Sequence, residues 1–123
     1  MMTKGMDRGK RAEELACAHL RNQGYQIIER NWRSPFGELD IVARDGESLV
    51  FVEVKARAGS AFGGAEEALT KRKRDRLVAT AAAYLAAVGA DLPVRFDLLA
   101  VTGEGIVLYK DAFRPEAGCS LGS

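Results

Sequence analysis

The sequence predicts a mixed α/β fold in which helices pack against one sheet, and two features carry this prediction. Asp45-Gly46 is a strong hairpin signal between two segments of alternating polarity, so an antiparallel pair of strands is expected there. A long helical segment then leads into another strand, and a crossover of that length normally joins parallel strands. The predicted order of elements is therefore α-β-β-β-α-β-β, with a mixed sheet.

The first half of the chain is expected to form one helix and three strands. Residues 7–23 form the helix, which ends at Gly24. Residues 25–32 are rich in β-forming side chains and predict the first strand. The segments on either side of the hairpin signal, 38–44 and 49–56, alternate in polarity and predict the second and third strands.

The second half is expected to form one long helix and two strands. The helix runs from about residue 66 to residue 88 and is closed by Gly89, and strands follow at 94–101 and 106–109. Spacings of i, i+4, i+7 and i+11 give the helix an apolar stripe that predicts burial against the sheet. The stripe consists of Leu77, Ala81, Tyr84 and Val88.

Length and composition indicate one folded domain. The 123 residues are 47% hydrophobic and 28% charged, which is typical of a soluble domain, here covering residues 1–123. We expect frayed ends at 1–6 and 114–123. The formal net charge of +1 excludes a protein whose whole surface attracts polyanions, so any nucleic-acid surface is a local patch.

Cysteine content and hydropathy indicate the cellular compartment in which the protein is expected. Cys17 and Cys119 are too few for a disulfide framework, and the single histidine, His19, leaves no zinc-binding spacing. No segment approaches the ~18 consecutive apolar residues of a membrane span, and the basic N-terminus lacks the apolar stretch of a secretory signal. We therefore expect a cytoplasmic protein that does not contact a membrane.

The hairpin carries charges on one of its two faces. Because strand side chains alternate, Glu38 and Asp40 share one face of the second strand, while Leu39 belongs to the other with Ile41 and Ala43. On the third strand Glu53 and Lys55 share a face. Two interpretations are open at this point, a metal site and a solvated sheet face with cross-strand ion pairs such as Lys55 with Asp40, and spacing alone favours the second.

In the first interpretation the acids hold a magnesium ion, because carboxylates on adjacent strands repel unless a cation separates them. Asp40, Glu53 and the main-chain carbonyl of Val54 would supply the hard oxygen ligands that Mg²⁺ prefers. Lys55 would position a water molecule or neutralise charge on the transition state. Glu38 lies one pleat outward and would have a supporting or water-mediated role.

Two helical residues favour an enclosed site. At 100° per residue, Glu13 falls on the apolar side of the first helix, and an acid directed towards a sheet usually has a partner there. Lys73 falls on the stripe side of the long helix, near Leu77, where it could reach a phosphate. The alternatives are a rim glutamate paired with Arg11 or Arg33, and a lysine that only extends from the core margin into solvent.

A basic run, KRKRDR at 71–76, needs separate interpretation. Such a run is usually a solvated helix face, but it could form part of a rim that follows nucleic-acid phosphates. Trp32 and Phe36 could stack on bases, although core packing is the favoured role of Trp32, and no base-specific readout is indicated. The candidate nucleic-acid-binding residues are Lys73, Arg33, Arg57, Lys71 and Arg72.

A resemblance to a known family rests on stretches that span nearly the whole chain. They are GKRAEELA at 9–16, GYQIIERNWRSPFGELDIVARDG at 24–46, LVFVEVKAR at 49–57, AFGGAEEAL at 61–69, KRDRLVATAAAYL at 73–85, VRFDLLAV at 94–101 and KDAF at 110–113. With these stretches the chain resembles the PD-(D/E)XK nuclease superfamily. Within it, the chain closely resembles the YraN family of uncharacterised, endonuclease-like bacterial proteins, related to archaeal Holliday-junction resolvases.

The resemblance implies a restriction-endonuclease-like core and a set of site residues. The metal-binding acids of the superfamily correspond to Asp40 and Glu53, its lysine to Lys55 and its helix-one acid to Glu13. Asp40, Glu53 and the Val54 carbonyl would then bind Mg²⁺ or Mn²⁺, Lys55 would orient the attacking water, and Glu13 would hold a second metal ion or that water.

We therefore expect a magnesium-dependent endonuclease that hydrolyses DNA phosphodiester bonds, with branched or recombination structures as candidate substrates and DNA favoured over RNA. Two other functions remain open. One is a nucleic-acid-binding module that keeps the nuclease fold without turnover, and the other is a protein-interaction factor that uses the hairpin acids as a partner surface. The resemblance also implies a symmetric homodimer.

Overall fold

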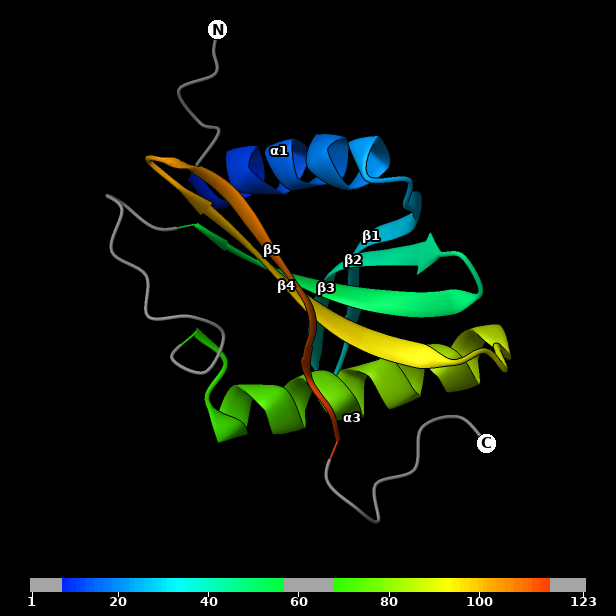
Figure 1. Ribbon diagram of the computed structural model, residues 1–123. Coiled ribbons are helices and arrows are strands. Elements are labelled where there is room, and N and C mark those ends of the chain that lie inside the picture. The colour runs from blue at the N-terminus through cyan, green and yellow to red at the C-terminus, as the bar shows by residue number, and fades with distance from the viewer. Residues whose placement is uncertain (1–7, 57–67, 116–123) are drawn as a thin grey trace, which may run out of the picture.

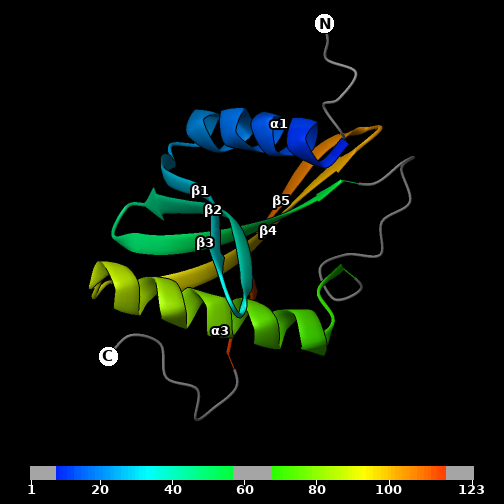
Figure 2. The same cartoon turned by 180° about the vertical axis from the view of Figure 1, so that it is seen from behind.

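The computed structural model describes residues 8–56 and 68–115, and in them five strands form one sheet with a helix on each face (Figures 1 and 2). In Figure 1, α1 lies above the sheet and α3 below it. The elements are α1 (Arg8–Asn22), β1 (Gln26–Ser34), β2 (Gly37–Asp45), β3 (Ser48–Ala56), α3 (Lys71–Val88), β4 (Val94–Thr102) and β5 (Gly105–Phe113).

The sheet is mixed, as the sequence predicted. Its strand order is β1-β2-β3-β4-β5, and β2 runs antiparallel to both β1 and β3. β3 and β4 pair in parallel because α3 crosses between them, and β5 returns antiparallel to β4. The predicted element order and the crossover are therefore confirmed for the residues that the structure describes.

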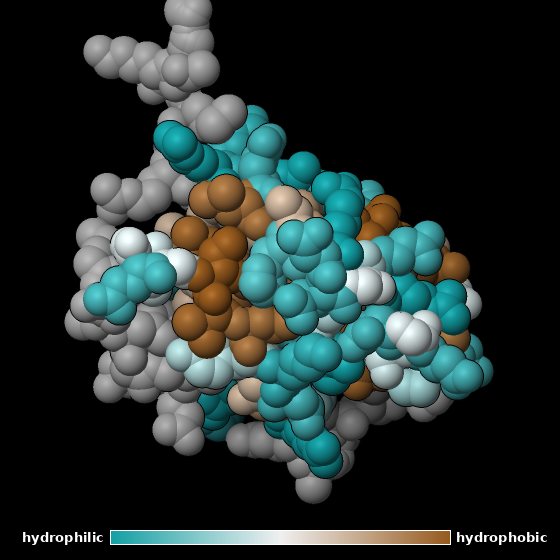
Figure 3. Space-filling view, turned by 45° about the horizontal axis from the view of Figure 1, so that its top comes forward, coloured by the Kyte–Doolittle hydropathy of each residue, from teal (hydrophilic) through white to brown (hydrophobic). Residues whose placement is uncertain are grey.

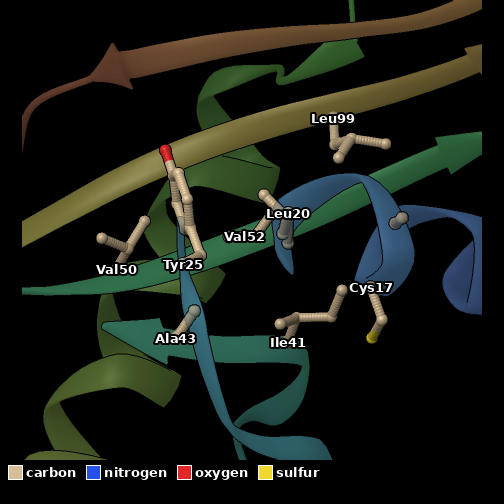
Figure 4. Close-up of a cluster of buried hydrophobic side chains, with 9 residues drawn as sticks. Cys17, Leu20, Tyr25, Ile41, Ala43, Val50, Val52 and Leu99 are labelled. Carbon is tan, nitrogen blue, oxygen red and sulfur yellow. The ribbon is translucent and has the colours of Figure 1, made fainter. Parts of the chain in front are cut away.

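One half of the core lies between the sheet and α1 (Figure 4). The inward side chains of β2 and β3 on this face meet the buried side of α1, where Cys17 and Leu20 are almost completely inaccessible to solvent. Tyr25 covers the end of this cluster, and its hydroxyl points towards β4. The strand residues of the cluster are Ile41, Ala43, Val50, Val52 and Leu99.

The other half lies between the sheet and α3, and aromatic rings dominate it. Tyr84 makes edge-to-face contacts with Trp32, at 5.2 Å between ring centroids, and with Phe51, at 5.9 Å. Phe51 also stacks on Phe96. The predicted core role of Trp32 is confirmed. The predicted apolar stripe of α3 is wrong at its last position, because Val88 is 51% exposed.

The start of α3 differs from the prediction. Thr70, the residue before the first helical residue Lys71, is extended, with φ −64° and ψ 163°. Its side chain accepts a hydrogen bond from the Lys73 N–H. Thr70 is thus an N-cap, which supplies one of the acceptors that the first turn of a helix lacks. α3 therefore begins at Lys71, whereas the sequence predicted a start near residue 66, which lies outside the described residues.

The last strand is also longer than predicted, spanning nine residues instead of the range 106–109. Its far end pairs Phe113 with Phe96, beyond a register shift at which Asp111 has a φ of +54°. The Asp111 N–H donates to the Asp97 carboxylate at 2.9 Å. A side-chain acceptor in the neighbouring strand therefore stabilises an irregular backbone that sequence alternation does not reveal.

Leu39 also differs from the prediction. Alternation assigned it to the face of Ile41 and Ala43, but it packs in the cluster under α3, whereas Ile41 and Ala43 pack under α1. The regular pairing of β2 with β3 ends at Ile41, and Asn31 in the neighbouring strand has a φ of +55°. The end of the β1–β2 hairpin is therefore twisted away from the rest of the sheet.

Several predictions lie outside the described residues, namely those for residues 1–6, Arg57, Cys119 and the tail from residue 116 onward. Arg114, also predicted to be frayed, pairs with Asp111 at 2.9 Å. Among the described helices, none is long and apolar enough to cross a membrane. Hydrophilic side chains cover much of the face in Figure 3, with an apolar area among them.

Candidate active site

The candidate site begins where β2 separates from β3. Ile41 and Val52 form the last regular pair of the two strands. Beyond it, the N–H of Val54 donates to the side chain of Asp40, with 2.9 Å between the nitrogen and Oδ2. A carboxylate thus occupies the place that a strand backbone would otherwise take. The regular backbone pairing of β2 with β3 is therefore replaced at this point by a bond to a side chain.

Asp40 and Glu53 face each other at this opening, and their side chains are hydrogen-bonded. Burial, followed by the charge of Asp40, raises the pKa of Glu53 to about 8, although Lys55 and Lys73 act in the other direction. Burial also raises the pKa of Asp40, against the effect of its bond with the Val54 N–H. Ionising both carboxyl groups at once is therefore unfavourable near neutral pH.

The remaining hairpin residues lie around this pair. In an extended strand the N–H and C=O of one residue leave from the same edge, so the Val54 carbonyl leaves β3 on the edge that faces Asp40. Lys55 is half-buried, and its charge acts on both carboxyl groups. Glu38 is exposed, and its charge raises the pKa of Asp40.

α1 brings Glu13 to the site from one face of the sheet. Its side chain is half-buried whereas that of Glu14 is exposed, as helical periodicity predicted. Burial and the charge of Asp40 raise the pKa of Glu13, while a hydrogen bond with the Asn31 side chain lowers it. Arg11 and Arg33 do not appear among the causes of this shift, which include Arg30.

Asn31 was not among the predicted site residues. Its φ of +55° lies in the left-handed region, which asparagine tolerates better than most residues do. This conformation lies within β1, at the residue whose side chain hydrogen-bonds Glu13. An asparagine inside a predicted strand is a weak sequence signal for such an interruption, and here it was overlooked.

α3 brings basic groups to the site from the other face. A pocket of about 240 Å³ opens there beside the carboxyl pair. Lys73 lines this pocket. Its side chain is exposed, whereas the sequence predicted a position at the buried edge of the helix. The residues that line the pocket are Gly37, Glu38, Asp40, Glu53, Lys73, Arg76, Leu77 and Thr80.

Arg76 is a second residue that the sequence analysis missed. It follows Lys73 by three positions and precedes Thr80 by four, so helical spacing places all three on one side of α3. The Thr80 hydroxyl donates to the Arg76 carbonyl at 2.8 Å. Arg76 ends the KRKRDR run, which holds four other basic residues. Only its helical spacing from Lys73 could have distinguished it from them as a site residue.

The other predicted nucleic-acid-binding residues do not line the pocket. Lys71 pairs with Asp75 at 2.8 Å one turn along α3, and Arg72 is exposed. Arg33 pairs with Glu38 across the hairpin at 3.4 Å, and the Arg33 side chain is 79% exposed. Arg57 lies beyond the end of β3, in the part of the chain that the structure does not describe.

The donor atoms at this site suit a hard cation. Within residues 8–56 and 68–115, no three His, Cys, Asp or Glu side chains form a ready-made metal cluster. The carboxyl groups of Asp40 and Glu53 and the carbonyl of Val54 are oxygen donors, and Mg²⁺ commonly binds one or two carboxylates while keeping water and phosphate oxygens. Burial is the largest cause of both raised pKa values, so ionised carboxylates are costly here, and a bound cation would offset that cost.

A second ionic cluster lies at the other end of β2 and was not predicted. Asp97 is buried in β4 and accepts hydrogen bonds from Arg95 at 2.9 and 3.0 Å, from the Tyr25 hydroxyl at 2.8 Å and from the Asp111 N–H. Arg95 also bonds Asp45 at 2.9 Å. Because the charge of Asp97 is fully paired, we interpret this cluster as structural. An acid inside the apolar strand VRFDLLAV was its sequence signal.

Comparisons with known proteins give a family without an assigned chemistry. A model of "Uncharacterised protein family UPF0102" matches residues 12–101. A UPF0102 protein of Pseudomonas aeruginosa is 49% identical over 102 residues, covering 80% of this chain and 82% of its own. One of Nitrosococcus oceani is 40% identical over 117 residues, covering 90% and 94%. One of Thermodesulfovibrio yellowstonii is 40% identical over 105 residues, covering 85% and 94%.

Proposed function

The chain belongs to the uncharacterised protein family UPF0102, and from this premise we propose that it is a metal-dependent endonuclease that hydrolyses DNA phosphodiester bonds. The observation that carries the proposal is the Asp40–Glu53 pair, two buried carboxyl groups that line one pocket where β2 leaves β3, and we propose that they share a proton. Paired acids with strongly raised pKa values in a pocket are a common property of catalytic sites.

The arrangement of elements supports a restriction-endonuclease-like core. A helix, an antiparallel three-stranded meander, a crossover helix and a parallel strand follow one another in the order that the resemblance to the PD-(D/E)XK nucleases implies. The acids stand on the second and third strands of the meander, and Lys55 follows Glu53 by two residues. This agreement in position supports the nuclease assignment of the fold.

The oxygen donors of Asp40, Glu53 and Val54 would hold Mg²⁺ or Mn²⁺. Such an ion, when bound, activates water and neutralises charge on a phosphoryl group. Both acids must be ionised to bind it, so occupation of the site requires release of the proton that they share. The nearby Lys55 and Lys73 favour that release, since their charges lower the pKa of Glu53.

The other residues would act on the water and on the substrate. Lys55 is placed to orient the attacking water and to neutralise charge developing on the phosphate. Glu13, hydrogen-bonded by Asn31, would hold the same water from the α1 side or contribute to a second cation site. Lys73 and Arg76 would bind phosphate oxygens at the pocket on the α3 side.

The proposal favours DNA over RNA, and branched or recombination structures are candidate substrates. A symmetric dimer would place two such sites on opposite strands of a duplex, and we retain it as an expectation from the resemblance. Light scattering coupled to size-exclusion chromatography measures the dimer directly.

Cleavage assays with linear and branched DNA, in Mg²⁺, Mn²⁺ or EDTA, test the proposal. We expect metal-dependent products from the wild type, and a loss of at least about 100-fold in rate for Asp40→Asn and Lys55→Met. A matched pair on α1 provides a control, because Glu13→Gln should impair cleavage and Glu14→Gln, an exposed neighbour, should not. Failure to cleave any substrate, or cleavage that survives Asp40→Asn, would contradict the proposal.

One observation favours a second function, a nucleic-acid-binding module on the same fold without turnover. A pKa of about 8 leaves Glu53 protonated at neutral pH, which weakens any metal site there. Calorimetric titration with Mn²⁺, beside DNA binding in EDTA, distinguishes the two functions. Tight DNA binding by a protein that takes up no metal ion at pH 8.5 would support the binding module.

A further inference from the structure

Phe36 has no role in the core or in the site described above. It is the second residue of the turn between β1 and β2, and its side chain is 58% exposed, the largest exposure among the large hydrophobic residues that the structure describes. Exposing a phenylalanine ring to water forgoes the stabilisation that its burial would give. Single exposed apolar residues need no explanation by themselves, so its position has to be considered.

The turn that carries Phe36 is held on both sides. The Phe36 N–H donates to the Ser34 hydroxyl oxygen at 3.1 Å, and that hydroxyl donates to the Gly37 carbonyl at 3.4 Å. Gly37 has a φ of +152° and lies against α3, where an added Cβ would stand 3.0 Å from Thr80 Oγ1 and 3.2 Å from the Arg76 side chain. The ring is therefore presented from a fixed backbone.

The turn also adjoins the candidate site. Gly37 and Glu38, the next two residues, line the same pocket as Asp40, Glu53 and Lys73. The ring is thus attached one residue from the wall of a pocket that would hold the reacting phosphate. The nucleotide bases of a DNA strand lie close to its phosphates, so a base beside the cleaved bond comes within reach of this turn.

The surroundings of Phe36 are charged. Arg33 and Glu38 form an exposed ion pair across the hairpin, and Arg76 lies against the adjoining glycine. A protein partner that buries an aromatic anchor normally surrounds it with further apolar contacts. A lone exposed ring on a turn that adjoins Arg33 and Arg76 resembles the surfaces that bind single-stranded nucleic acids, in which aromatic side chains stack on bases near basic groups.

We propose that Phe36 stacks on an unpaired base next to the phosphate held at the pocket, so that the site selects DNA with a junction between double-stranded and single-stranded segments. This inference rests on the proposed function. In an intact duplex each base is already stacked on its neighbours, and access requires unstacking energy that a junction does not require. Stacking on an aromatic side chain strengthens the binding of a base, and a ring on a fixed backbone loses little entropy on binding.

Equilibrium binding tests this inference without cleavage. The full chain is titrated, in Ca²⁺ and again in EDTA, against a fluorescein-labelled forked duplex and a blunt duplex of the same length. We expect Phe36→Ala to weaken binding of the fork by about tenfold, corresponding to one aromatic stacking contact, and to change binding of the blunt duplex by less than twofold. Phe36→Trp should bind the fork at least as tightly as the wild type.

A base analogue makes the contact visible. With 2-aminopurine at the first unpaired position, stacking on Phe36 should quench its fluorescence when the wild type binds, and Phe36→Ala should remove this quenching. Val107→Ala is the matched control, because Val107 is 45% exposed in β5 and belongs to no part of the site. Thermal melting should show both variants folded, since both residues are on the surface.

The outcomes separate this inference from the proposed function. Binding of the fork that depends on Phe36, with no hydrolysis in Mg²⁺, would support stacking and contradict endonuclease activity. Hydrolysis that depends on Asp40, with equal effects of Phe36→Ala on fork and blunt duplex or with none on either, would overturn the stacking role alone. Self-association that requires Phe36, without preference for the fork, would assign the ring to a protein contact and also overturn it.

Discussion

Glu53 is largely buried beside Asp40, and burial raises the pKa of its carboxyl group to about 8. Its carboxyl group is removed from water at a place where Asp40 already carries negative charge, so ionising both groups is costly. The shared proton removes that cost as long as the pH stays below the raised pKa. A bound cation would do the same at higher pH, and for this reason the protein's stability should report on the state of the pair.

The first prediction concerns Glu53→Gln. The pKa of Glu53 rises from an ordinary 4.5 to about 8 on folding, so between these values the unfolded chain loses a proton that the folded protein keeps. The free energy of unfolding of the wild type must therefore fall as pH rises through this window. Glutamine keeps a hydrogen bond without titrating, so the metal-free variant should be more stable at pH 8 by about 1–3 kcal/mol.

Urea unfolding in EDTA at pH 4.5, 6.5 and 8 measures this difference. The stability advantage of Glu53→Gln over the wild type should be absent at pH 4.5 and largest at pH 8. The reason is that the wild type loses stability as the Asp40–Glu53 pair loses its proton. Glu47→Gln, at an exposed position on the same hairpin, should show no such trend. A pH-independent difference would show that the two carboxyl groups do not share a proton.

At the residue scale, the sequence supported some site positions and could not reveal others. Helical spacing separated Glu13 from Glu14, and strand alternation brought Asp40 and Glu53 to one face. The hydrogen bond between these acids depends on where β2 leaves β3, which no local pattern encodes. The contribution of Asn31 likewise depends on a single left-handed residue within a strand.

At the scale of elements, the β1–β2 hairpin and α3 meet at Gly37. An added Cβ would press on the side chains of Thr80 and Arg76, which would have to shift by a few tenths of an ångström, and the φ of +152° at Gly37 suits glycine. The contact fixes the hairpin end that carries Asp40 relative to the helix that carries Lys73. The geometry of the site thus depends on a residue that has no functional group.

The second prediction is that Gly37→Ala destabilises the protein by roughly 2–3 kcal/mol, since it combines an unfavourable φ with overpacking against α3. Gly46→Ala is the control. Its φ of +62° is also unfavourable, but nothing lies within 4 Å of the added Cβ, so a loss of about 1 kcal/mol is expected. Urea denaturation compares the two variants, and equal losses would show that packing at Gly37 contributes nothing.

The elements themselves were more predictable than their ends. The hairpin dipeptide Asp45-Gly46 and the crossover were sufficient for the antiparallel hairpin and the parallel pair, because both are local signals with few topological solutions. The start of α3 was predicted too early because the capping role of Thr70 was not recognised. The full length of β5 depends on contacts with Asp97 in another strand, and is not a local property.

At the scale of the whole molecule, the proposed site joins segments that are distant in the chain. Glu13 comes from α1, the carboxyl pair from β2 and β3, and Lys73 from α3. In the unfolded chain these groups are apart, so a cation that binds them together binds the folded state preferentially. Metal binding should therefore be measurable as global stability, whether or not the protein hydrolyses DNA.

The last prediction follows from this linkage. At a free Mn²⁺ concentration 100 times the dissociation constant, the folded state should gain about 2.7 kcal/mol, and for a domain of this size the melting temperature should rise by roughly 10 °C or more. The gain should be larger at pH 8.5 than at pH 6, because ligation requires Asp40 and Glu53 to release their shared proton.

Asp40→Asn should lose most of this gain in stability. Glu14→Gln should keep it, since Glu14 is exposed on the outer side of α1. A shift of equal size in Asp40→Asn would place the metal ion elsewhere, and the absence of a shift at both pH values would exclude a cation site at the carboxyl pair.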